Sequence, residues 1–200
     1  MWHNPIIWRT PKPAVCLTFD DGPDPRVTPE LLDLLARHQV RATFFLIGER
    51  VDRHPELVRR ISQQGHGIGN HSYTHPRLLG KSQRTVLQEM CATDRAIHRA
   101  AAVATALFRP PHGLFGKNLV KVCSATGKKM VLWSVSTRDY QTDVTTADIR
   151  DRLLRRVGPG AIVLLHDGHA NGGKTLEALA QALPVLKERG MSFIPISDGC

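Results

Sequence analysis

Hydrophobic and polar positions along this chain follow two alternating patterns. Between the apolar runs, apolar residues recur every three or four positions, as they do in helices that pack one face on a sheet. The apolar runs themselves are typical of buried strands and lie at residues 15–20, 41–46, 67–70, 107–109, 129–135, 161–166 and 191–196. About seven strands that alternate with helices predict an α/β fold with a mostly parallel sheet, either open or closed into a barrel.

Helix boundaries are marked by proline, glycine and small polar residues. Thr28 followed by Pro29 predicts a helix start with Thr28 as the N-cap. A second helix opens at residues 54–56 and ends at Gly65. Further helices are expected at residues 82–101, 117–125, 148–157 and 174–189, the last interrupted or kinked at Pro184. Because no linker or internal repeat breaks the series, we expect one domain over residues 1–200.

Charge and composition narrow the function classes. The chain has 27 Lys and Arg against 18 Asp and Glu, a net charge of +9. The basic residues are scattered without interleaved aromatic residues, which argues against a nucleic-acid partner. No apolar stretch is long enough for a transmembrane segment, and the start lacks the order of a signal peptide. Four cysteines without a C-x-x-C pair identify neither a disulfide nor a metal site.

Ionisable residues follow five of the predicted strands. They are Asp20 and Asp21, His71 and His75, Arg109, Asp139, and His166 with Asp167. Each has an ordinary explanation when taken alone, such as a polar turn or a chance histidine pair. In parallel α/β folds, however, active sites lie at the carboxyl ends of the strands. Five strands that deliver such residues to one edge therefore predict an active site there.

The types of these residues indicate a metal centre. Two histidines and one carboxylate form a zinc site with an open position, so His71, His75 and one of the two aspartates are candidate ligands. The other aspartate would lie beside the reacting water, where a general base belongs. A nearby dication would offset the repulsion between Asp20 and Asp21.

The remaining ionisable residues complete an acid–base set. Arg109 is expected to hold the free carboxylate by a charge-assisted hydrogen bond. His166, from another strand, is then available as a general acid, with Asp139 as its orienting partner.

Five segments together resemble the motifs of the polysaccharide deacetylases, carbohydrate esterase family 4, which include the nodulation-factor chitooligosaccharide deacetylases. In chain order the segments are T-F-D-D-G-P (18–23), H-S-Y-T-H (71–75), R-P-P-H-G (109–113), S-T-R-D-Y (136–140) and L-L-H (164–166). The resemblance implies a distorted (β/α) barrel of seven or eight units with outer helices. It also implies a cofactor, Zn2+ or another divalent ion such as Co2+.

The same resemblance assigns roles to the residues. It implies Asp20 as base, Asp21, His71 and His75 as metal ligands, Arg109 as the brace of the base, and His166 as the acid tuned by Asp139. For substrate binding it implies Leu164 in an acetyl-methyl pocket and backbone groups near Pro111 and His112 at the oxyanion. Trp133 and Tyr140 complete the expected substrate-binding set. His112 stands where the family usually has an aromatic residue, and Ser136 and Tyr140 replace an acid and a tryptophan.

The implied function is hydrolytic removal of N-acetyl groups from N-acetylglucosamine in a chitin-like or peptidoglycan substrate, with release of acetate. The expected partner is therefore an N-acetylated glycan, with no nucleic acid and no obligate protein partner. Two alternatives stay open: an O-acetyl esterase on xylan or another acetylated glycan, and a non-catalytic sugar-binding homologue. The family favours an extracellular or cell-envelope location, while the start of the chain leaves the cytoplasm open.

Overall fold

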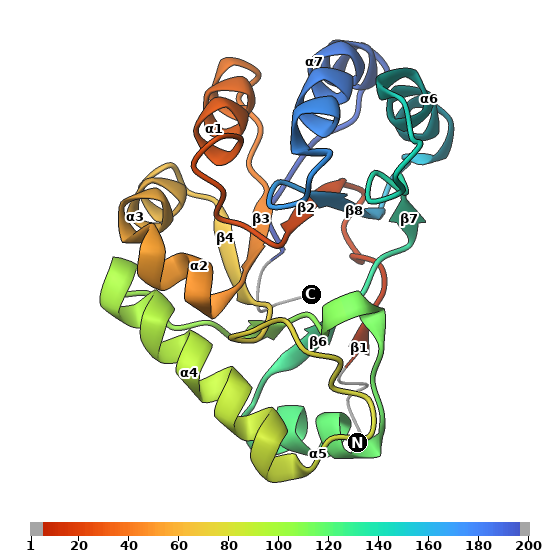
Figure 1. Cartoon of the computed structure of the whole chain (residues 1–200). Helices are drawn as coiled ribbons and strands as arrows, with labels where there is room; N and C mark the ends of the chain where they lie inside the picture. The colour runs from red at the N-terminus through yellow and green to blue at the C-terminus, as the bar shows by residue number, and fades with distance from the viewer. Residues whose placement is uncertain (1–5, 197–200) are drawn as a thin grey trace.

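Eight parallel strands curl around a common centre in this computed structural model, which describes residues 6–196 (Figure 1). Their order across the sheet is β1-β6-β5-β4-β3-β2-β8-β7. Their bounds are β1 Ile6–Ile7, β2 Cys16–Asp20, β3 Thr43–Leu46, β4 Gly67–Asn70, β5 Leu107–Phe108, β6 Lys129–Val131, β7 Val135–Ser136 and β8 Ile162–His166. The predicted α/β barrel-like fold is confirmed, with eight strands where the sequence predicted about seven.

Helices cover the outside of this curled sheet (Figure 1). Their bounds are α1 Thr28–Arg37, α2 Gly48–Arg53, α3 Pro55–Gln63, α4 Gln83–Ala101, α5 Lys117–Ala125, α6 Thr146–Arg156 and α7 Gly172–Glu188, with a short 3-10 helix η1 at Pro111–Gly113. The side chain of Ser82 caps α4 by accepting from the Thr85 N–H. Thr145 and Asp148 form a capping box at the start of α6. None of the helices between residues 6 and 196 combines the length and apolarity that a membrane span needs.

The strand register brings the predicted site residues together. Strands β2 and β8 are buried along almost their whole length, as expected for the centre of a parallel sheet covered on both sides. Their pairing sets Asp20 beside His166. On the other side of β2, β3 pairs with β2 and β4 pairs with β3, so the end of β4 lies at the same edge of the sheet. The interior of the curl is packed by apolar side chains, namely Ile7, Cys16, Phe45, Leu107, Val131, Ile162 and Ile196. The polar residues at the strand ends are therefore supported by a buried apolar core inside the curled sheet.

Several predicted boundaries were wrong. Thr28 is the first residue of α1 rather than its N-cap, because its hydroxyl is used elsewhere: it accepts from the Asp24 N–H and bonds Asp167. The predicted strand 129–135 divides into β6 and β7, because its backbone changes partner strand between them. The Leu132 N–H donates to the Ile7 carbonyl of β1, whereas the Ser134 N–H donates to the Ile162 carbonyl of β8. At residues 191–196 there is only an isolated bridge between Val15 and Phe193.

Two short elements, β1 and α2, were not predicted, because two residues of strand and six of helix show no clear periodicity. Helix α7 continues through Pro184 without interruption. Proline removes one N–H donor there, while Leu179, Leu183 and Leu186 pack into the main core and hold both sides of the helix in place.

Candidate metal and catalytic centre

A cavity of about 350 Å³ opens at the carboxyl ends of the strands. Nine of the residues predicted for the site line it, namely Asp20, Asp21, His71, His75, His112, Trp133, Tyr140, Leu164 and His166. Arg109 and Asp139 are buried directly behind Asp20 and His166, with which they form ion pairs. Pro111 is also buried and precedes His112 in η1. Side chains from six strand ends therefore meet around one space.

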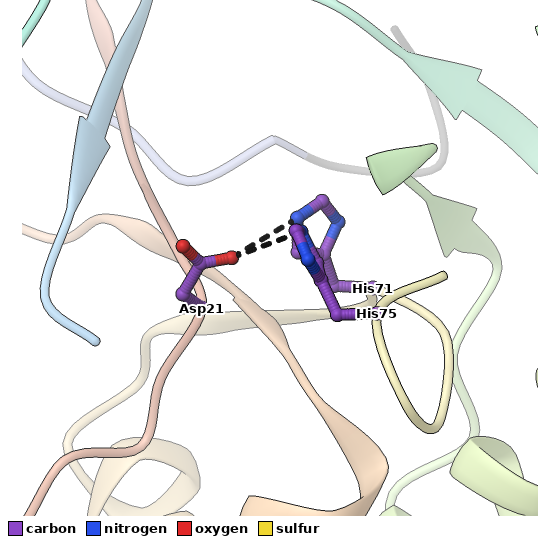
Figure 2. A group of neighbouring side chains, drawn as sticks. All are labelled: Asp21, His71 and His75. Carbon is purple, nitrogen blue, oxygen red and sulfur yellow. Dashed lines mark ion pairs between the residues drawn. The ribbon is translucent and has the colours of Figure 1, made fainter. Parts of the chain in front are cut away.

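Asp21, His71 and His75 point toward one another (Figure 2). Oδ1 of Asp21 lies 3.2 Å from Nε2 of His75 and 3.5 Å from Nε2 of His71. One ligand atom from each residue falls within 4.8 Å of the others. Nδ1 of His71 is 2.8 Å from the Arg109 carbonyl, which accepts a hydrogen bond only if Nδ1 carries the proton. Nε2 of His71 then presents a lone pair toward Asp21.

This arrangement fits a bound cation. Oδ1 of Asp21 is buried and has no hydrogen-bond partner among the described residues. A carboxylate oxygen that faces imidazole lone pairs is repelled by them unless a positive ion lies between them. Two histidines and a carboxylate are also a donor set that zinc and related divalent ions accept. The residues present therefore fit the metal that such a site needs.

Electrostatics keep these groups in the protonation states of metal ligands. Burial alone would raise the pKa of Asp21, but its contact with His71 and the positive charge of His166 lower that pKa well below its usual range. Burial lowers the pKa of His75 to about 4. Near neutral pH the carboxylate is ionised and the His75 imidazole is neutral, as metal binding requires.

The loop that carries both histidines is braced from α4. Backbone φ is positive at Ser72 and His75, a conformation that these residue types rarely adopt without support. Oε2 of Glu89 accepts hydrogen bonds from the N–H groups of Tyr73 (2.8 Å) and Thr74 (2.9 Å), and Oε1 accepts from the Thr74 hydroxyl (3.0 Å). This role of Glu89 was not predicted, because nothing in its spacing on α4 points to Tyr73 and Thr74, 16 and 15 residues earlier.

Asn70 adds a second brace at the other end of this loop. Its side-chain oxygen accepts from the Ser72 N–H at 2.9 Å. Its amide donates to the Met90 carbonyl and to Asp94, and Asp94 pairs with the buried Lys128. The position and orientation of the histidine loop thus depend on a polar network that reaches from β4 to α4 and to Lys128, the residue before β6.

Asp20 and Arg109 form a buried pair beside the candidate metal ligands. Nη1 of Arg109 donates to Oδ1 of Asp20 at 2.6 Å and to the Thr18 hydroxyl at 2.7 Å. Nε and Nη2 donate to the carbonyls of Val131 and Leu132. Burial lowers the pKa of Arg109 while Asp20 raises it, and the guanidinium remains charged. Oδ2 of Asp20 stays directed toward the centre, 3.7 Å from Nε2 of His71.

His166 and Asp139 form a second ion pair at the cavity, at the end of the strand next to that of Asp20. Nδ1 of His166 is 2.9 Å from Oδ1 of Asp139, whose Oδ2 accepts from the His166 N–H and from Thr175. Burial lowers the pKa of His166, but the hydrogen bond and charge of Asp139 outweigh it and raise that pKa to about 9. The imidazole is therefore protonated near neutral pH, with Nε2 left for the cavity.

The predicted substrate-binding residues surround this centre. Leu164 and Trp133 supply an apolar wall, and the Tyr140 ring lies 5.6 Å from the His166 ring, edge to face. The N–H groups of Gly113 and Leu114 already bond carbonyls of η1 and its preceding residue, and Pro111 has no N–H. The His112 N–H is therefore the donor that remains for an oxyanion, in a residue with φ of 58°.

Two further residues belong to the site: His169, which was not predicted, and Asp167, which was expected at the strand end but without an assigned role. His169 lines the cavity, and its ring centroid lies 6.0 Å from that of His166. Asp167 is buried beneath the Asp20–Asp21 turn, where it bonds Thr28, and burial raises its pKa to about 7. A Cβ on Gly22 would come within 2.6 Å of this carboxyl group, so only glycine fits the turn. The histidine at 169 could have been noticed from its place after the sixth strand.

Known proteins resemble this chain over most of its length. The family model described as polysaccharide deacetylase matches residues 8–131. The chain is 41% identical over 192 residues to a chitooligosaccharide deacetylase from Sinorhizobium fredii, covering 90% of this chain and 89% of that protein. It is 38% identical over 188 residues to a peptidoglycan-N-acetylglucosamine deacetylase from Bacillus cereus, covering 92% and 67%. A crystal structure of a peptidoglycan N-acetylglucosamine deacetylase shares the fold with a TM-score of 0.92 at 35% identity, covering 96% of this chain and 91% of that one.

Proposed function

Because this chain belongs to the polysaccharide deacetylase family, we propose that it hydrolyses the acetamide groups of N-acetylglucosamine units in a glycan and releases acetate. The observation that carries the proposal is that two ion-paired groups border one cavity together with the candidate metal ligands. Asp20, held by Arg109, and His166, held by Asp139, end the neighbouring strands β2 and β8 beside the Asp21–His71–His75 cluster. A base and an acid beside a metal site suit amide hydrolysis, which needs a proton removed from water and another delivered to nitrogen.

Asp21, His71 and His75 would hold a divalent ion, which we propose to be Zn2+ or an ion of similar preference such as Co2+. When bound, such an ion supplies Lewis acidity that polarises the amide carbonyl and acidifies a water molecule. The hydrogen bond from Nδ1 of His71 to the Arg109 carbonyl fixes the tautomer that leaves Nε2 free as a ligand.

Asp20 acts as the general base in this proposal. Arg109 occupies Oδ1 and keeps the carboxylate oriented, while Oδ2 faces the centre and takes the proton of the attacking water. The water oxygen forms a bond to the carbonyl carbon, and the negative charge that develops on the carbonyl oxygen is met by the His112 N–H. Support for this step comes from the absence of a competing partner for that N–H within the described residues.

His166 then acts as the general acid. Asp139 holds its Nδ1 proton, so that Nε2 presents a second proton to the amide nitrogen as the carbon–nitrogen bond breaks. The amine leaves with the sugar, and acetate stays until it is released from the apolar wall of Leu164 and Trp133. A pKa of about 9 keeps His166 protonated at the start of each turnover.

Acetate release tests the proposal. Protein stripped of metal would be assayed with chitooligosaccharides, peptidoglycan strands and O-acetylated xylan, before and after addition of zinc or cobalt. We expect metal-dependent loss of N-acetyl groups, followed by mass spectrometry. Release from xylan alone would replace the proposal by the esterase alternative, and no release from any glycan with metal bound would indicate a non-catalytic homologue.

A further inference from the structure

Positive charge is concentrated in one part of this chain. Residues 77–129 contain ten Lys and Arg but only two acids, Glu89 and Asp94. The net charge of the whole chain is +9, so this segment supplies nearly all of the excess. Both acids are already engaged, Glu89 by the histidine loop and Asp94 by Lys128. Three of the basic residues are also engaged, since Arg99, Arg109 and Lys128 pair with Asp52, Asp20 and Asp94. The exposed charge of the segment includes Arg77, Lys81 and Lys117.

Two stretches of this segment leave the cavity wall and run together. One continues from His75 to Lys81, and the other continues from Gly113 to Lys117. The Asn118 amide donates to the Lys81 carbonyl at 3.0 Å, and a Cβ built on Gly116 would lie 3.2 Å from Cδ1 of Leu79. In Figure 1 the beginning of α4 lies next to α5, where the two stretches end. The two stretches therefore lie side by side where they lead away from the cavity wall.

We define the basic rim as Arg77, Leu79, Lys81, Leu114 and Lys117, all of them exposed. Within the described residues, no ion pair engages the three basic side chains. Leu79 and Leu114 are 53% and 37% exposed and provide apolar surface between the charges.

The basic rim begins at the cavity. His75 and Gly113 line the cavity, Arg77 lies two residues after His75, and Leu114 directly follows Gly113. A polymer whose reacting sugar occupies the cavity would therefore extend over the rim in one direction. Its sugar faces would meet the two leucines, and its substituents would meet Arg77, Lys81 and Lys117.

We propose that the basic rim binds carboxylate groups of the glycan outside the reacting sugar, so that the preferred substrate is an N-acetylated glycan with carboxylates on neighbouring sugars. This inference rests on the proposed deacetylase function. Exposed cations attract such groups over several ångströms and pair with them by charge-assisted hydrogen bonds. A neutral chitin chain would gain only the apolar contacts.

Binding to the protein with chelator present tests the rim separately from turnover. The probe is a glycan strand of alternating N-acetylglucosamine and N-acetylmuramic acid with free lactyl carboxylates. The same strand with those carboxylates amidated isolates charge from shape. The rim variant is Arg77→Gln, Lys81→Gln and Lys117→Gln combined. Its matched control, with the same loss of charge, combines Arg37→Gln, Arg155→Gln and Arg156→Gln on the last turns of α1 and α6, at the opposite edge of the sheet.

We expect the rim variant to bind the carboxylate strand more weakly by on the order of tenfold at low salt, and the control to stay within about twofold of the parent. The parent's preference for the carboxylate strand over the amidated strand should disappear near 1 M salt, where charges are screened. Equal losses in both variants, or equal binding of both strands, would overturn the inference. Tight rim-dependent binding without acetate release from metal-loaded protein would support the rim and overturn the proposed function instead.

Discussion

Arg109 and Asp20 form an ion pair of 2.6 Å in which the arginine side chain is completely buried and the aspartate is 4% exposed. The guanidinium also bonds Thr18 and two backbone carbonyls, and it lies 4.1 Å over the Phe45 ring. Burial of a charge is costly unless every donor is used, and here the flat fork of arginine matches the acceptors around it. This pair therefore joins the catalytic side of the cavity to the packed interior of the barrel.

Arg109→Lys should disturb both stability and activity, although it keeps the charge. A lysine ammonium cannot reach Asp20 and the carbonyls of Val131 and Leu132 together, so buried acceptors lose their donors. We expect a loss of about 1–3 kcal/mol in the free energy of unfolding from each unsatisfied group. Denaturant titration measures it, with the exposed Arg84→Lys as control. A stable, fully active Arg109→Lys protein would contradict the role of the fork.

Asp139→Asn should move the alkaline limb of the pH–rate profile to lower pH. His166 must be protonated to donate to nitrogen, so activity falls as pH rises through its pKa of about 9. Without the charge of Asp139, that pKa falls toward the ordinary value and the limb follows it. The exposed Asp143→Asn, in the same loop, should leave the limb in place. If the alkaline limb of Asp139→Asn stays where it is in the parent, Asp139 does not control the pKa of the general acid His166.

The same pair should make stability depend on pH. Since the folded-state pKa of His166 is raised, its contribution to the free energy of unfolding is fully present below about 6.5 and is lost as pH rises through about 9. Asp139→Asn should flatten this part of the stability curve. Denaturation of metal-free parent and variant at several pH values between 6 and 10 provides the comparison.

Much of the fold and site could be predicted from the sequence, because parallel strands send their following residues to one edge. The apolar runs that end in Asp20 and His166 located two neighbouring strands, and their register indeed sets these residues side by side. Residues with long-range partners were harder. Glu89 lies on α4 and supports the loop that precedes this helix in the chain. Its spacing along α4 resembles that of any partly exposed helical acid. Its role depends on tertiary contact, which periodicity does not record.

Glu89→Gln should weaken metal binding without removing a ligand. An amide offers one acceptor oxygen where the carboxylate offers two, so the N–H groups of Tyr73 and Thr74 and the Thr74 hydroxyl can no longer all be satisfied. Loss of an outer-shell partner typically lowers metal affinity about 10–100-fold. Zinc affinity would be measured by competition with a chromogenic chelator. Gln88→Ala, one residue earlier on the exposed face, is the control and should bind zinc like the parent.

The adjacent carboxylates should be separable by function when each is replaced by asparagine. Asp21→Asn exchanges an anionic candidate ligand for a neutral amide, so metal content should fall sharply, with activity partly restored by excess zinc. Asp20→Asn keeps the shape beside Arg109 but cannot accept the proton of water, so metal should remain while turnover falls by on the order of 10²–10⁴-fold. Atomic emission and acetate release, measured on the same samples, distinguish the two. If Asp20→Asn loses the metal and Asp21→Asn keeps it, the two aspartates have been assigned in reverse. If both variants retain metal and activity, the Asp20–Asp21 turn has neither role.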